Sequence, residues 1–150
     1  MAKRYDNVRI TNAVDGTVIE GHDAVEAHFE RERKLAEQHG STLTFQLYRA
    51  NLAGTTRTDV QGPRLAELRI AGGEVSGTDT VAAVKQRVLP ALLGDHGPAT
   101  HITFVFGGRV MRDEALFYAD HFMLLPCWVQ VVLSDVPFAD VIAAIRQRPA

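Results

Sequence analysis

The pattern of apolar and polar positions changes period several times along the chain and predicts a mixed α+β fold. Residues 42–48 alternate strictly, with Leu43, Phe45 and Leu47 on one face, as a half-buried strand requires. Three later runs of apolar and β-branched residues predict further strands, at 65–70, 102–106 and 129–133.

A helix is expected between the second and third of these strands. Apolar residues recur there at helical spacing, at Val81, Val84, Val88 and Leu92. We expect Thr78 or Asp79 to cap this helix. Pro90 should bend or end it, because proline lacks an amide donor and its ring clashes with the preceding turn.

Both ends of the chain carry additional predicted elements. Residues 7–20 are typical of a hairpin with its turn at Asp15–Gly16. Residues 21–38 predict a helix capped by Asp23 and closed by Gly40.

A polar loop is expected over 50–64, and a closing helix should begin at Pro137, which fits the first turn of a helix. The apolar side of that closing helix is formed by Phe138, Val141, Ile142 and Ile145.

The order of elements from residue 42 onward is strand, strand, helix, strand, strand, and local motifs there resemble ubiquitin. Residues 78–88, TDTVAAVKQRV, are similar to the start and body of ubiquitin's helix. Residues 104–113, FVFGGRVMRD, resemble its third strand, glycine turn and following short strand. Residues 119–122 resemble the acidic-aromatic corner before its last strand, and residues 129–133 resemble that strand.

This resemblance implies an α+β fold: a ubiquitin-like β-grasp domain over 42–134. Residues 1–41 would form an N-terminal hairpin–helix extension, and residues 135–150 would contain a C-terminal helix.

The resemblance also implies an interaction patch. The family's patch would fall on Leu52, Val105 and Val132, and Gly108 beside it would let a partner backbone approach closely. Gln130 stands where ubiquitin's patch has a histidine.

The resemblance implies a structural ion pair as well. Lys85 and Asp113 match the family's helix lysine and the acid after its third strand, which implies that the pair is partly buried.

One family feature is missing from the sequence. Activation requires a diglycine tail after the last strand, but here Leu133 is followed by Ser134 and Asp135. Conjugation to target proteins is therefore not expected.

The resulting hypothesis is a non-catalytic ubiquitin-like interaction module, acting as a structural or adaptor subunit of a larger protein assembly. The alternative is an adaptor that mimics ubiquitin towards ubiquitin receptors or the proteasome. In the first hypothesis the β-sheet face, extended by the terminal elements, docks the partner. The alternative depends on the patch at Leu52, Val105 and Val132: Val105→Ala should weaken binding to a ubiquitin-binding domain, whereas a structural subunit would show no such binding.

Charge and composition argue against nucleic acid and membranes as binding partners and leave proteins as the expected partners. The net charge is −2, and the 16 basic residues are scattered, so no nucleic-acid footprint is expected. No apolar stretch is long enough to span a bilayer, and the start of the chain lacks the core of a secretory signal. We expect a soluble protein of the cytoplasm or another intracellular compartment, without cofactor or small-molecule substrate. No metal site is expected either, since the histidines offer only weak ligand candidates such as His22 with Asp23.

The single cysteine allows an enzyme reading. Cys127 could act as a nucleophile, with His101 or His121 as base and Asp120 as orienter. However, Cys127 lies in the apolar run 124–129, where cysteine usually packs as a small hydrophobe. We therefore expect no catalytic residues.

Two further patterns concern surfaces. The runs 116–118 and 122–128 hold more large apolar side chains than a β-grasp core of this size can bury, so some should lie under the terminal extensions or at an interface. The charged run 30–34 is most simply a solvated helix face; the alternative is a docking helix that uses Val25 and Phe29.

Overall fold

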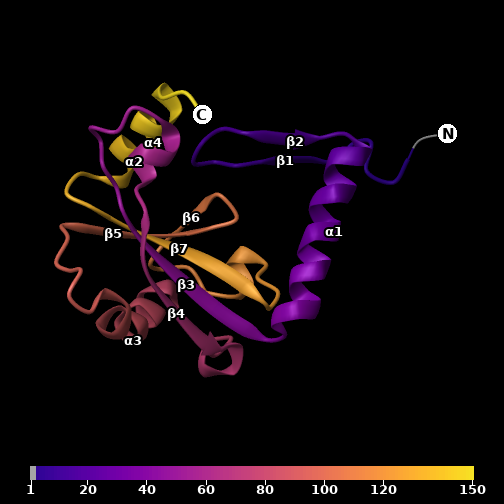
Figure 1. Cartoon of the computed structure of the whole chain (residues 1–150). Coiled ribbons are helices and arrows are strands. Elements are labelled where there is room, and N and C mark those ends of the chain that lie inside the picture. The colour runs from indigo at the N-terminus through magenta and orange to yellow at the C-terminus, as the bar shows by residue number, and fades with distance from the viewer. Residues whose placement is uncertain (1–2) are drawn as a thin grey trace.

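A computed structural model of the protein describes residues 3–150, so the first two residues of the predicted 1–41 extension lie outside the described residues. The described residues form a mixed α+β fold with a five-stranded mixed sheet, a separate two-stranded hairpin and four α-helices (Figure 1). The strands are β1 (Arg9–Thr11), β2 (Val18–Glu20), β3 (Thr42–Arg49), β4 (Arg64–Ala71), β5 (His101–Phe106), β6 (Arg109–Met111) and β7 (Cys127–Ser134). The helices are α1 (His22–His39), α2 (Arg57–Gln61), α3 (Val81–Leu93) and α4 (Phe138–Gln147).

The five-stranded sheet has the order β4-β3-β7-β5-β6. The β3–β7 pair is parallel, and the other three neighbouring pairs, β3–β4, β5–β7 and β5–β6, are antiparallel. The strict alternation predicted for β3 is confirmed, because Leu43, Phe45 and Leu47 are all fully buried. One face of the sheet therefore carries the main core.

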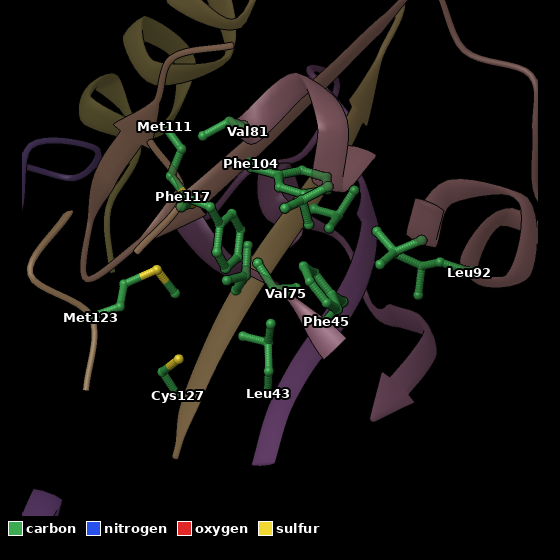
Figure 2. Close-up of a cluster of buried hydrophobic side chains, with 14 of the residues drawn as sticks. Leu43, Phe45, Val75, Val81, Leu92, Phe104, Met111, Phe117, Met123 and Cys127 are labelled. Carbon is green, nitrogen blue, oxygen red and sulfur yellow. The ribbon is translucent and has the colours of Figure 1, made fainter. Parts of the chain in front are cut away.

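The helix α3 covers this core face. Its apolar positions Val81, Val84, Val88 and Leu92 are buried as their spacing predicts. Figure 2 shows the aromatic rings gathered between helix and sheet. The ring centroid of Phe45 lies 5.6 Å from that of Phe104 and 6.1 Å from that of Phe117. Removing these side chains from water is the main source of stability in this region.

The ends of α3 differ from the sequence prediction. Thr80 is the N-cap, accepting a hydrogen bond from the Ala83 amide at 3.2 Å, so the prediction of a cap at Thr78 or Asp79 is wrong. Pro90 does not end the helix, which continues to Leu93. Proline has no amide to donate to the Gln86 carbonyl, so the helix continues past Pro90 without that hydrogen bond.

Two other local predictions are wrong. The helix α1 begins after Gly21 without a side-chain cap, and Asp23 lies inside its first turn. The polar loop predicted over 50–64 contains the short helix α2, which Thr56 caps by accepting a hydrogen bond from the Asp59 amide at 3.1 Å. Five residues are too few to show a helical apolar period, so only the cap could have indicated α2.

A second, smaller core lies where β3 and β7 end. Val60 of α2 packs there with Val141, Ala144 and Ile145 of α4. The end of the chain is also held by polar contacts, since the Arg148 guanidinium donates to the Leu52 carbonyl at 3.0 Å and to the Gly54 carbonyl at 2.8 Å. The closing helix is thus part of the fold.

The N-terminal elements lie on the side of the sheet away from α3. Figure 1 shows α1 standing apart from the sheet and the β1–β2 hairpin reaching from the start of α1 towards α2 and α4. The predicted apolar face of α1 is largely not covered: Val25 is buried, but Phe29 and Leu35 are each 39% exposed.

Candidate functional site

Two residues of the sequence-predicted patch, Val105 and Val132, lie on the sheet face opposite α3, but the chain itself covers them. Val105 of β5 pairs with Gln130 of β7, and Val132 lies further along the same strand. Val105 is 3% exposed and Val132 is 7% exposed. In this conformation neither valine is presented to solvent as a binding site would require.

Gly108 shows what takes the place of a partner. Its backbone has φ 76°, and its carbonyl accepts a hydrogen bond from the Val14 amide at 3.1 Å. A Cβ on residue 108 would stand 2.3 Å from Cγ of Asn12. The close backbone approach expected of a partner is made by the turn of the N-terminal hairpin.

Leu52 lies apart from these residues. It is half-buried and packs against the second core, beside α2 and α4. Its carbonyl accepts the hydrogen bond from Arg148. The structure therefore does not gather the three predicted patch residues into one open surface.

The space between hairpin and sheet is incompletely filled. A cleft of about 340 Å³ lies there, with Ile10 and Ile19 on its hairpin side and Val105, Trp128 and Gln130 on its sheet side. The hairpin is therefore seated on the sheet mainly through its turn.

An open apolar surface does exist, on the loop before β7. Phe122 is 87% exposed and Leu124 is 84% exposed. Both line a cleft of about 670 Å³ that also includes Phe29 and Leu35 of α1 and Trp128 of β7. The cleft thus brings apolar side chains of α1 together with those of the loop before β7.

The conformation of Phe122 adds to this observation. Its φ of 52° places a bulky residue in the left-handed region, the one non-glycine residue in positions 3–150 with positive φ. That conformation costs on the order of 1–2 kcal/mol. Strained residues of this kind are concentrated at functional sites.

The sequence indicated this surface only indirectly. The excess of apolar residues in the runs 116–118 and 122–128 signalled that some could not be buried. The structure sorts them: Phe117 and Met123 enter the main core, whereas Phe122 and Leu124 do not. Alternation and spacing do not distinguish these neighbours, because the segment forms turns rather than a regular element.

Lys85 and Asp113 are in contact, with Nζ 2.6 Å from Oδ1. The lysine side chain is 15% exposed and the aspartate side chain is 62% exposed. The ammonium also donates to the Ile102 carbonyl at 3.1 Å, which ties α3 to β5. The pair thus has one buried member and one solvated member.

Cys127 is packed in the main core and is 4% exposed. Burial raises the pKa of its thiol to about 12. His121, one of the two suggested bases, instead has its Nδ1 2.9 Å from the Phe117 carbonyl. This environment holds Cys127 as a neutral thiol, whereas a nucleophile needs the thiolate.

Residues 3–150 contain no group of three histidine, cysteine or acidic side chains placed to hold a metal ion. Among the helices of these residues, none combines the length and apolar character needed to cross a membrane.

The chain matches no protein-family model and no curated protein at a significant level. Its function is therefore inferred from the geometry of its surfaces.

Proposed function

We propose that residues 42–134 form a ubiquitin-like β-grasp domain and that the protein is a non-catalytic interaction module, a structural or adaptor subunit of a larger protein assembly. The fold part is supported by the sheet order β4-β3-β7-β5-β6. The antiparallel pairs β3–β4 and β5–β6 are joined through α3, and the last strand, β7, lies between β3 and β5, parallel to β3 and antiparallel to β5. This is the arrangement that the resemblance to ubiquitin implies.

The observation that carries the binding role is the pair of exposed side chains Phe122 and Leu124, beside an apolar cleft. Covering one large apolar side chain contributes about 1.5–3 kcal/mol. A partner protein that inserts apolar side chains between α1 and the 122–126 loop would bury both residues together with Phe29.

The ubiquitin-mimicking adaptor has less support. It needs Val105 and Val132 to be open to a receptor, and both are buried beneath other parts of the chain. The cysteine hydrolase also has little support, since the Cys127 thiol is buried and its pKa is raised to about 12.

The test is affinity purification of the tagged full chain from its native cells, compared with the double variant Phe122→Ser/Leu124→Ser. We expect the wild type to retain a fixed set of proteins in near-constant ratio and the double variant to lose them. A matched control is Val18→Ser, at a residue that is 42% exposed on β2. If the double variant folds, as judged by an unchanged Tm, and still retains the whole set, the proposed surface is wrong.

A further inference from the structure

The N-terminal arm, defined as β1, β2 and α1 (residues 9–39), is a self-contained unit. Among the described residues, every ion pair that involves the arm has both members inside it: Arg9–Glu20, His22–Glu26, His28–Glu32, Arg33–Glu30 and Arg33–Glu37. Tyr5, just before the arm, packs its ring against His22 and Phe29. Most of the polar and aromatic contacts of the arm would therefore survive if it moved as one body.

The arm is attached to the remaining structure mainly at its two ends. At the end of α1 the His39 ring lies edge-on to Trp128 at 5.2 Å. At the other end the hairpin turn is held by the Val14–Gly108 hydrogen bond and by Arg146, which donates to the carbonyls of Ala13 and Val14. Between these points Val25 is the one buried residue of α1, and the cleft beneath the hairpin remains unfilled.

The connection from the arm to the sheet is built as a hinge. Gly40 joins α1 to β3 with φ 64° and ψ −134°, a conformation that favours glycine. Nothing lies within 4 Å of the position that a Cβ would take there. Glycine at this position therefore meets the demand of the backbone conformation and not of packing, and an extended conformation at residue 40 would remove that demand.

We propose that the sheet face around Gly108 is an interaction surface for the hairpin of a second copy of this chain, so that the protein forms an arm-exchanged dimer. This inference does not rest on the proposed function. The chemistry that the surface accepts is that of its present occupant: a backbone amide for the Gly108 carbonyl, an amide side chain over its Cα and, across the cleft from Val105, the aliphatic side chains of Ile10 and Ile19.

A second copy of the chain presents this chemistry because it carries the same hairpin. Exchange keeps each docking contact and changes only the conformation at Gly40, which is why such exchange is a low-cost route to dimers. The monomer is favoured at low concentration because the tethered hairpin has a high effective concentration, of the order of millimolar. The dimer should accordingly appear at high protein concentration or after refolding at high concentration.

The test uses two full-length chains, Asn12→Cys and Gly108→Cys, mixed in denaturant, refolded together under reducing conditions at about 1 mM and then oxidised. The Cβ of residue 108 would stand 2.3 Å from Asn12 Cγ, so cysteines at these positions lie within disulfide reach when the hairpin is docked. A disulfide between the two chains can form there only if one chain's hairpin docks on the other chain's sheet. We expect a covalent heterodimer as the main oxidised product.

The background is set by Asn12→Cys mixed with Gly73→Cys, an exposed glycine whose added Cβ would meet nothing within 4 Å. The chain with both Asn12→Cys and Gly108→Cys checks that the docked pair can form the bond. The proposal would be overturned if the double variant forms its internal disulfide efficiently but the Asn12→Cys and Gly108→Cys mixture yields no more covalent heterodimer than this background.

A cysteine-free measurement covers the case in which Gly108→Cys does not fold. Gly40→Ala disfavours the reversal at the hinge and should raise the fraction of dimer, measured by light scattering during size-exclusion chromatography. Gly73→Ala is the matched control and should leave that fraction unchanged. If the wild type and Gly40→Ala are both monomeric after refolding at about 1 mM, the proposal is overturned as well.

Discussion

β3 and α1 lie next to each other in the sequence and are stabilised in opposite ways. In β3 the side chains of Leu43, Phe45 and Leu47 are fully buried, whereas α1 has 18 residues and buries Val25 alone. The helix depends on local contacts instead, such as the Arg33 guanidinium between Glu30 and Glu37. Exposed pairs of that kind contribute only a few tenths of a kcal/mol each.

The sheet region therefore holds the contacts that stabilise the fold, whereas the arm has few buried contacts and is free to interact at the surface. Removing contacts from the sheet region should unfold the protein, whereas removing contacts from the arm should change how the arm docks. Substitutions in the two regions test this comparison.

The largest effect is expected from Phe45→Ala. The ring is fully buried between Phe104 and Phe117, so its loss should lower the free energy of unfolding by about 3–5 kcal/mol. Urea denaturation followed by Trp128 fluorescence measures it. The matched arm variant is Phe29→Ala, at a ring that is 39% exposed, and a loss there as large as that at Phe45 would contradict the comparison.

The second core should give the next effect. Ile145 of α4 is 7% exposed and packs on α2, so Ile145→Ala should cost about 2–4 kcal/mol. Ile142 is its partly exposed neighbour and provides the control. A loss at Ile145 as small as that at the control, in the same denaturation experiment, would mean that α4 is not integral to the fold.

Gly108→Ala probes the contact between the two regions. The new Cβ would meet the Asn12 side chain, and φ 76° strains any residue other than glycine, so we expect a cost of about 1–2 kcal/mol. The specific readout is faster hydrogen exchange at the Val14 amide, which donates to Gly108. Gly73→Ala should leave this exchange unchanged. Unchanged exchange in Gly108→Ala would show that the turn is not held there.

Acid stability should depend more on the sheet region than on the arm. The Arg87 guanidinium and the Ser76 amide hold the pKa of Asp79 below its usual value. Because the folded pKa is lowered, this stabilisation is present above the ordinary pKa near 4 and is lost as the pH falls through the lower folded pKa. Asp79→Asn should therefore flatten the loss of stability below about pH 4.

Glu30 provides the arm counterpart, since Arg33 lowers its pKa in the same direction. The pair is exposed and screened by solvent, so Glu30→Gln should leave the acid transition close to that of the wild type. Chemical denaturation at a series of pH values measures both variants, and a stronger effect of Glu30→Gln would reverse the comparison.

The smallest effect is expected at the Lys85–Asp113 pair. A fully buried pair would make removal of one partner cost about 3–5 kcal/mol. Asp113 is 62% exposed, so its charge is solvated and Asp113→Asn should cost less than about 1 kcal/mol. A larger loss in urea denaturation would mean that the ammonium of Lys85, whose side chain is 15% exposed, cannot find water when its partner is removed.

The sequence by itself determined the regular elements of the sheet region. Strict alternation placed Leu43, Phe45 and Leu47 in the core, and helical spacing placed Val81, Val84, Val88 and Leu92 against them. These patterns are readable because a repeating backbone geometry turns sequence spacing directly into a face. The sequence predicted the ends of the elements less well. Thr78, Asp79 and Thr80 can all act as N-caps, and the tertiary structure determines that α3 begins after Thr80.

The tertiary structure alone decided which surfaces are covered. Nothing in the local sequence of Gly108 or Val105 shows that Asn12 and Val14, far earlier in the chain, would lie on them. Likewise, Phe122 and Leu124 look as apolar in the sequence as Phe117 and Met123, yet only the latter pair is buried. Burial depends on contacts between distant segments, and a short stretch of sequence carries no information about which distant segment will arrive.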